Sequence, residues 1–145
     1  MKRSAMNYDD FAVGQLFPPS RYVISGSESD EFIRTFAHGP LKAEHPAVLP
    51  EQVRTTTVRP VHPTLVGSYQ PQHAAFAWPT GVLHARESIS LRAPVYTGEE
   101  LEARVLVKNK YEKNQRKFIV LEITVRKLET DVDAVVVERT LVWPS

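Results

Sequence analysis

Cysteine is absent from the 145-residue chain, which excludes a disulfide framework, a thiol nucleophile and a zinc site built on cysteine. Apolar runs are only a few residues long, far short of the roughly 20 residues that a membrane-spanning helix needs. Residues 1–4 are basic, but no apolar segment of the kind found in signal peptides follows them. We therefore expect a cytoplasmic protein that does not bind membranes.

Neither sign of charge is in excess, since the chain has 18 Lys and Arg residues and 17 Asp and Glu residues. This balance argues against a nucleic-acid partner, because such proteins usually carry a basic surplus. Hydrophobic residues make up 42% of the chain and charged residues 24%, as in ordinary soluble domains. The length suits a single domain over residues 1–145.

Glycine-rich phosphate loops and the H-E-x-x-H metal motif are also missing, because the six glycines are isolated from one another. We therefore expect no nucleotide cofactor. A metal site needs three or four ligands at clear spacing, and the histidines show no such pattern, so we expect no metal. The histidines are His38, His45, His62, His73 and His84.

The first half of the chain predicts a strand at residues 21–25 and a helix from Ser27 to about His38. The Ser27 hydroxyl can accept from the Asp30 backbone N–H, and acidic residues suit the first turn. Gly39-Pro40 ends this helix.

Seven of the eleven prolines lie between Pro40 and Pro79. Residues 40–64 show no period beyond a possible strand at 55–61, and a loop this long is more often a binding loop or lid than filler. Residues 64–77 predict a second helix, which Pro71 would allow to start as late as Gln70.

Period-two alternation dominates after residue 82 and predicts four long strands joined by short turns, hence antiparallel hairpins. The sequence indicates an α+β fold in which one face of a curved antiparallel sheet wraps a helix. The positions expected on the buried face are 83, 85, 87, 89, 91 and 93, then 101, 103, 105 and 107, then 119, 121, 123 and 125, and finally 135, 137, 139, 141 and 143.

Glu44-His45 places a carboxylate beside an imidazole, a combination that supports general acid–base catalysis. A hydrated loop pair is the other interpretation. Gly67, with Ser68 beside it, lies near a helix start, where backbone N–H groups can bind a substrate carbonyl. A structural glycine is equally consistent with that position.

His84 is expected on the polar face of its strand with Arg86 and Ser88, either contacting substrate or satisfied by a cross-strand hydrogen bond. Lys108, Lys110 and Arg116 belong to a basic cluster around one hairpin turn. They could bind the phosphates of coenzyme A, or they could simply be solvated and discourage strand aggregation.

Residues 81–101 (GVLHARESISLRAPVYTGEEL) resemble the MaoC-like dehydratase and hydratase family, most closely the N-terminal, substrate-holding half of two-part R-specific enoyl-CoA hydratases. The resemblance rests on Leu83-His84, Pro94-Val95 and Gly98, and the front end at residues 11–14 and 27–30 agrees. It implies a hotdog fold with the second helix at its centre. It also implies pairing of two hotdogs, with acyl thioesters of coenzyme A or acyl carrier protein bound between them.

Catalytic members of that family carry Asp-x-Asn-Pro-x-His after the first helix. Here the corresponding stretch is 40–46 (PLKAEHP), so His45 matches the histidine, Pro40 replaces the aspartate, and Glu44 is the nearby carboxylate. If the chain is catalytic, His45 and Glu44 are the candidates, and Gly67, Ser68, His84, Lys108, Lys110 and Arg116 would hold substrate.

The incomplete motif indicates an acyl-thioester-binding subunit of an enoyl-CoA hydratase or 3-hydroxyacyl-thioester dehydratase, in a homodimer or with a catalytic hotdog partner. Two alternatives remain: a self-sufficient hydratase or thioesterase, and a non-enzymatic acyl-CoA-binding module. The thioester is the substrate, and no separate cofactor is expected.

Overall fold

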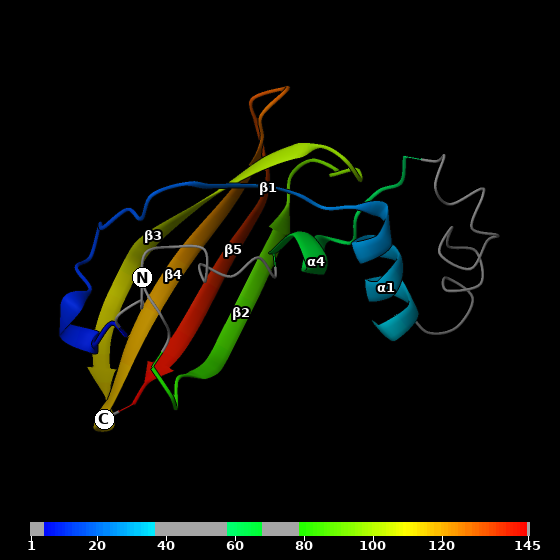
Figure 1. The fold of residues 1–145 in the computed structure, drawn as a ribbon. Coiled ribbons are helices and arrows are strands. Elements are labelled where there is room, and N and C mark those ends of the chain that lie inside the picture. Colours follow the sequence, from blue (N-terminus) through cyan, green and yellow to red (C-terminus); the bar gives the residue numbers. More distant parts are fainter. Residues whose placement is uncertain (1–4, 37–57, 68–78, 145) are drawn as a thin grey trace.

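The computed structural model describes residues 5–36, 58–67 and 79–144 of the chain. A five-stranded antiparallel sheet in the order β1-β3-β4-β5-β2 forms its body (Figure 1). The elements are η1 (Tyr8–Asp10), β1 (Ser20–Val23), α1 (Gly26–Phe36), α4 (Pro63–Gly67), β2 (Leu83–Leu91), β3 (Glu100–Lys113), β4 (Arg116–Lys127) and β5 (Val132–Trp143).

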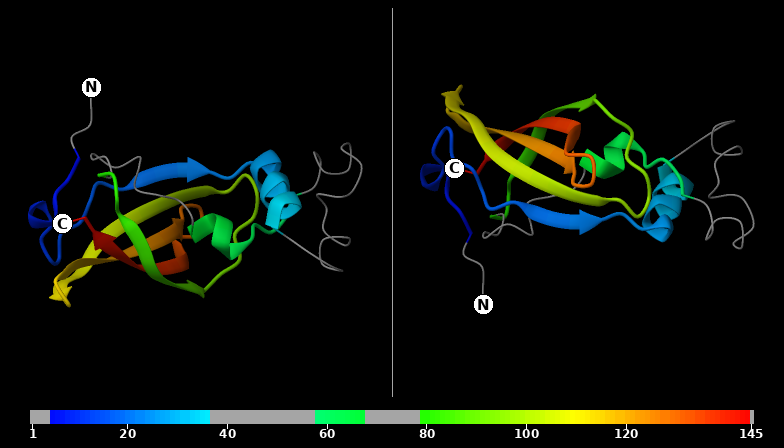
Figure 2. Two further views of the ribbon diagram at one scale, coloured as in Figure 1. Left: turned by 90° about the horizontal axis from the view of Figure 1, so that it is seen from below. Right: turned by 90° about the horizontal axis from the view of Figure 1, so that it is seen from above.

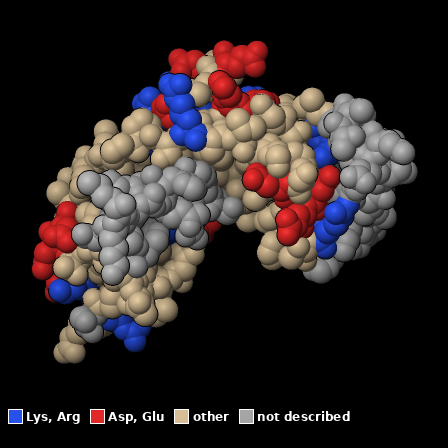
Figure 3. All heavy atoms as spheres, viewed as in Figure 1, with Lys and Arg blue, Asp and Glu red and all other residues tan. Residues whose placement is uncertain are grey.

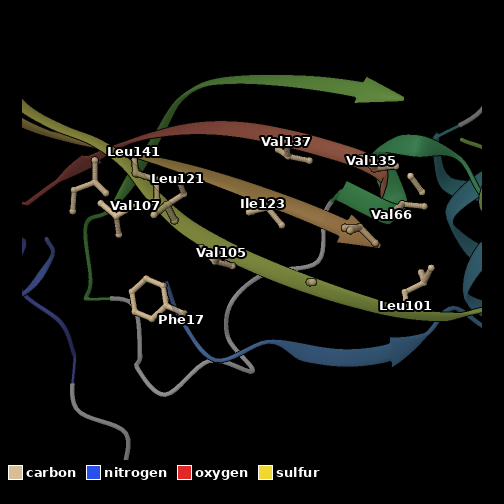
Figure 4. Packing of buried hydrophobic residues seen from close by; sticks show 14 of the residues in the cluster. Phe17, Val66, Leu101, Val105, Val107, Leu121, Ile123, Val135, Val137 and Leu141 are labelled. Atoms are coloured by element: carbon tan, nitrogen blue, oxygen red, sulfur yellow. The ribbon is translucent and has the colours of Figure 1, made fainter. Parts of the chain in front are cut away.

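The predicted alternation is confirmed in β3, β4 and β5, where the expected inward positions 101–107, 119–125 and 135–143 are buried at every second residue. These side chains form one apolar layer on the inner face of the sheet (Figure 4). Eight of them have no exposed surface, namely Leu101, Val107, Ile119, Leu121, Ile123, Val125, Val135 and Val137. Burial of this layer supplies the main driving force for folding.

Tight turns join the long strands, as the sequence predicts. Asn114 and Gln115, between β3 and β4, have φ angles of 52° and 63°, the left-handed values that a type I′ hairpin turn requires. Asp131, between β4 and β5, has a φ of 56°. These geometries match the right-handed twist of the flanking strands.

Helix α4 lies in the concavity of the curved sheet, between the β1 side and the β2 side (Figure 2). Its Val66 side chain is fully buried in the core beside β5 (Figure 4). Two strands also reach its backbone, because Tyr22 Oη of β1 donates to the Val66 carbonyl at 3.3 Å, and Arg139 Nη2 of β5 donates to the Gly67 carbonyl at 3.1 Å. The described helix begins at Pro63, one residue before the predicted start at Thr64, and proline suits a first turn. Residues 68–77 of the predicted helix lie outside the described residues.

The N-terminus of α1 differs from the prediction. Ser25, not Ser27, caps the helix: its hydroxyl accepts from the Glu28 N–H at 3.1 Å, and the Glu28 carboxylate accepts from the Ser25 N–H at 3.3 Å. This reciprocal capping box needs Glu or Gln three residues after the cap, which Ser25 has and Ser27 lacks. The helix is described to Phe36, so its predicted end at His38 lies outside the described residues.

Loop 40–64 is described only from residue 58. Its predicted strand at 55–61 appears there as a single bridge between Pro60 and Tyr96. Arg59 fixes this segment to α1, because its buried guanidinium lies 2.9 Å from Asp30 Oδ1 and donates to the Gly26 carbonyl at 3.2 Å.

The two edges of the sheet are treated differently. Residues 14–17 pair with the outer side of β3 beyond the end of β1, through hydrogen bonds such as Phe17 N–H to Val105 O at 3.0 Å. Strand β2 forms the other edge, and within residues 5–36, 58–67 and 79–144 no segment pairs with its outer side. A free strand edge can accept another strand.

Candidate functional site

A β-bulge in β2 changes which side chains face the interior. His84 is opposite Leu141 and Arg86 is opposite Thr140, so Ala85 is an extra residue in the ladder. The bulge puts His84 on the inner face with Glu87, although an undisturbed strand would point residues three apart in opposite directions. The prediction that His84 shares a face with Arg86 and Ser88 is therefore wrong, and so is the inward placement of Leu83, which is 63% exposed.

A chain of polar contacts runs inward from this bulge. His84 Nε2 lies 2.9 Å from Glu87 Oε2, and the same oxygen accepts from Arg139 Nε at 2.8 Å. Arg139 Nη2 then donates to the Gly67 carbonyl at the end of described α4. We call His84, Glu87 and Arg139 the bulge cluster.

Exposure decreases along the bulge cluster. The side chain of His84 is 50% exposed, that of Glu87 25% and that of Arg139 6%. Arg139 occupies an inward position of β5 directly opposite Glu87, so its charge is balanced across the strand pair. A buried guanidinium requires such a partner, because an unpaired buried charge is strongly destabilising.

The bulge cluster resembles the arrangement by which enzymes orient a histidine. The contact to Glu87 engages Nε2 of His84, which leaves Nδ1 for another partner. Glu87 is fixed in turn by Arg139. The arrangement can position an imidazole for proton transfer or for binding a polar substrate group.

Gly67 packs closely against the sheet. A Cβ at this position would lie 2.7 Å from Val137 Cγ2, so the absence of a side chain lets α4 approach β5. This gives the glycine a structural reason, and its carbonyl binds Arg139. Its predicted companions in the site, Ser68, Glu44 and His45, lie outside the described residues.

The three basic candidates are not brought together with His84. Lys108 Nζ contacts Glu138 at 2.6 Å and Glu122 at 3.5 Å, and its hydrogen bond to Glu138 raises the pKa of Lys108. Lys110 donates to the Phe11 carbonyl at 2.9 Å. Both side chains therefore have partners within the chain. Over the face drawn in Figure 3, acidic and basic residues are interspersed.

Arg116 lies at the tip of the β3–β4 hairpin. It lines an open hollow with Lys113, Asn114 and Phe118. This hollow is at the same end of the sheet as His84, because β2 begins where β5 ends and where β4 begins. Of the predicted phosphate contacts, Arg116 thus lies beside a hollow formed by described residues.

Glu87 and Arg139 were missed by the sequence reasoning. Both fall at inward positions of otherwise apolar alternations, and their charges are opposite. Charged residues at two expected core positions are a signal that could have identified them. Within the described part of the chain, no three potential ligands gather to hold a metal, and no helix has the length and apolar character to span a membrane.

Searches against protein-family models and against curated proteins give no match. Solved structures do match. An R-hydratase of Pseudomonas aeruginosa, PhaJ1, is 17% identical, with a TM-score of 0.67 over 95% of this chain and 85% of that one. A MaoC-like dehydratase of Rhodospirillum rubrum is 14% identical, with a TM-score of 0.67 over 94% and 96% of the two chains.

The HadBC complex of Mycobacterium tuberculosis, a 3R-hydroxyacyl-ACP dehydratase, contains a chain of the same fold. It is 16% identical, with a TM-score of 0.66 over 90% of this chain and 96% of that one. The chain thus has the hotdog fold of the MaoC-like hydratases and dehydratases, and the predicted α+β architecture is confirmed.

Proposed function

We propose that the chain is an acyl-thioester-binding hotdog subunit that works in the hydration of 2-enoyl thioesters or the dehydration of 3-hydroxyacyl thioesters. The observation that carries this proposal is its structural similarity, over nine-tenths of its length or more, to an R-hydratase and a 3R-hydroxyacyl-ACP dehydratase. The MaoC-like motifs of residues 81–101 point in the same direction. Fold alone does not determine chemistry, so the proposal also depends on the site.

The edge at β2 supports an assembly of two hotdogs. Strand β2 is exposed along almost its whole length, and Leu83 and Leu91 are 63% and 55% exposed there. A second hotdog, either another copy or a catalytic partner, would cover this edge. HadBC is itself a complex, which supports partnering of this kind.

The substrate is a thioester of coenzyme A or of acyl carrier protein, and both carry phosphate. Arg116 and Lys113, in the hairpin hollow, supply two cations at the end of the sheet where His84 lies. Arginine and lysine are the usual ligands of phosphate groups. We therefore assign phosphate contact to this hollow rather than to Lys108 or Lys110, which have partners within the chain.

Two measurements on the purified chain test this function. Turnover of crotonyl-CoA and of a longer 2-enoyl-CoA is measured by the loss of the enoyl-thioester absorbance. Binding of a saturated acyl-CoA is measured by calorimetry. Saturable binding in the micromolar range is expected. A chain that neither binds nor turns over any acyl-CoA would refute the proposal.

Assembly is tested by light scattering across a range of protein concentrations. Wild type should be dimeric at low micromolar concentration. Leu83→Lys places a charge at the free edge and should shift the protein toward monomer. Val13→Lys is the matched control, because Val13 is 60% exposed on the arm at the opposite side of the sheet. Monomeric wild type would contradict the assembly.

A further inference from the structure

The contact between His84 and Glu87 is not needed to stabilise the interior. Arg139 is already satisfied by Glu87 and by the Gly67 carbonyl. A quarter of the Glu87 side chain is exposed, so water can reach its remaining lone pairs without His84. The imidazole is therefore an addition to a network that is complete without it.

The chain departs from a regular ladder to make this contact. Ala85 is bulged out, which leaves it unpaired and turns His84 toward Glu87. Bulges are over-represented beside active sites, where they re-aim a side chain. The residues opposite His84 on β5 and β4, Leu141 and Ile119, are apolar and buried, while half of the His84 side chain is exposed to solvent.

We propose that His84 is a catalytic acid–base residue for 2-enoyl and 3-hydroxyacyl thioesters, with Glu87 and Arg139 as its positioning residues. This inference rests on the proposed function and goes beyond it, because it gives the subunit a proton-transfer group of its own. That group is distinct from the predicted pair at Glu44 and His45. It also lies on β2, the strand that a second hotdog would cover.

The chemistry balances without any further reagent. In hydration, His84 Nδ1 takes a proton from water as the water oxygen bonds to C3 of the enoyl group. The π electron pair of the C2–C3 double bond moves to C2 and the thioester carbonyl. The imidazolium then returns the proton to C2, so water has added across the double bond and the histidine is neutral again. Dehydration is the reverse sequence.

The main test compares wild type with His84→Ala and His84→Asn in the enoyl-CoA assay. General acid–base catalysis typically contributes about 100-fold to 10,000-fold, so kcat should fall by at least about 100-fold in both variants. Added imidazole should restore part of the activity of His84→Ala. Arg86→Gln is the matched control, because Arg86 is opposite Thr140 on the other side of the bulge, and it should keep its activity.

The positioning role of Glu87 has a spectroscopic readout. In wild type, nitrogen NMR of the neutral His84 ring should show the proton on Nε2. In Glu87→Gln that preference should weaken, and kcat should fall while KM stays nearly constant. A Glu87 that served stability alone would leave the tautomer population of His84 unchanged.

The outcomes separate this inference from the proposed function. Full turnover in His84→Ala and His84→Asn would overturn the role of His84 and leave the hydratase function standing. Acyl-CoA binding by wild type without turnover would also overturn it, and would leave a substrate-holding subunit. Absence of both binding and turnover would remove the proposed function, and the inference with it. Turnover that depends on His84 and is rescued by imidazole supports both.

Discussion

Replacing Glu87 with alanine should destabilise the protein substantially, because it leaves the Arg139 guanidinium buried without its counter-charge. The side chain of Arg139 is 6% exposed, and its Nε lies 2.8 Å from the carboxylate. Breaking a buried ion pair by removing one partner costs about 3–5 kcal/mol. Glu87 is 25% exposed and the Gly67 carbonyl still accepts from Nη2, so we expect the lower end, about 3 kcal/mol.

The same reasoning predicts a strong coupling between the two residues. The double variant Glu87→Leu with Arg139→Met removes both charges, and its apolar side chains fill similar space. Replacement of a whole buried pair by apolar residues is often neutral or stabilising. The double variant should therefore be more stable than Glu87→Ala, with a coupling free energy of roughly 2 kcal/mol or more.

Urea unfolding followed by circular dichroism measures these differences, at a fixed protein concentration because an oligomer's stability depends on it. Ser88→Ala serves as the control, since Ser88 is an exposed neighbour of Glu87 on the same strand. A loss below about 1 kcal/mol in Glu87→Ala, or strictly additive effects in the double variant, would refute the buried-charge account of the bulge cluster.

Three further predictions concern residues around the site. Gly67→Ala should cost about 1–3 kcal/mol in unfolding free energy through overpacking against Val137, and combining it with Val137→Ala should cost less than the sum of the two changes. Asp30→Ala should lower the melting temperature, because it removes the carboxylate that balances the charge of the buried Arg59 guanidinium. A hydrogen bond from Arg104 lowers the pKa of Glu102 in the folded protein. The stabilisation that this carboxylate provides is therefore present above about pH 4.3, and it is lost as the pH falls through the lowered pKa of Glu102. Unfolding free energies measured against pH should therefore show a shallower acid decline in Glu102→Gln.

The sheet was largely predictable from the sequence, because its inward positions are apolar and its turns are short. In β4, Ile119, Leu121, Ile123 and Val125 alternate without exception, and a slip of one residue would expose all of them. The same rule fails at the start of β2. The alternation from Leu83 looks continuous, but the bulge at Ala85 turns His84 to the inner face and Leu83 to the outer face. The sequence has no local mark of this bulge, since alanine is compatible with either geometry.

The helix cap and the central helix show a second kind of limit. Ser25 and Ser27 are both good capping residues, and only the reciprocal bond from Glu28 favours the first. Gly67 carried two interpretations that the sequence could not separate, because a close approach to Val137 depends on how α4 packs against β5. Tertiary contacts decide such cases, and local residue patterns do not encode them.

The candidate site was only half predictable, and the missing half lay in exceptions to the pattern that located the core. The sequence identifies His84 as a candidate but predicts the wrong face for it. The alternation predicts the correct, inward face for Glu87 and Arg139 but does not by itself identify them as site residues. Because the two strands pair in register at these residues, the two exceptions form one ion pair.

That ion pair bears on function as well as on folding. Replacing a buried ion pair by apolar side chains of similar volume is often neutral or stabilising, so burial of Arg139 and Glu87 is poorly explained by stability alone. A fixed carboxylate beside an imidazole supplies what an apolar pair cannot, namely a charged contact that holds the ring of His84 in place. Glu87 and Arg139 are thus better explained as supports for the half-exposed histidine at the sheet edge than as contributors to the core.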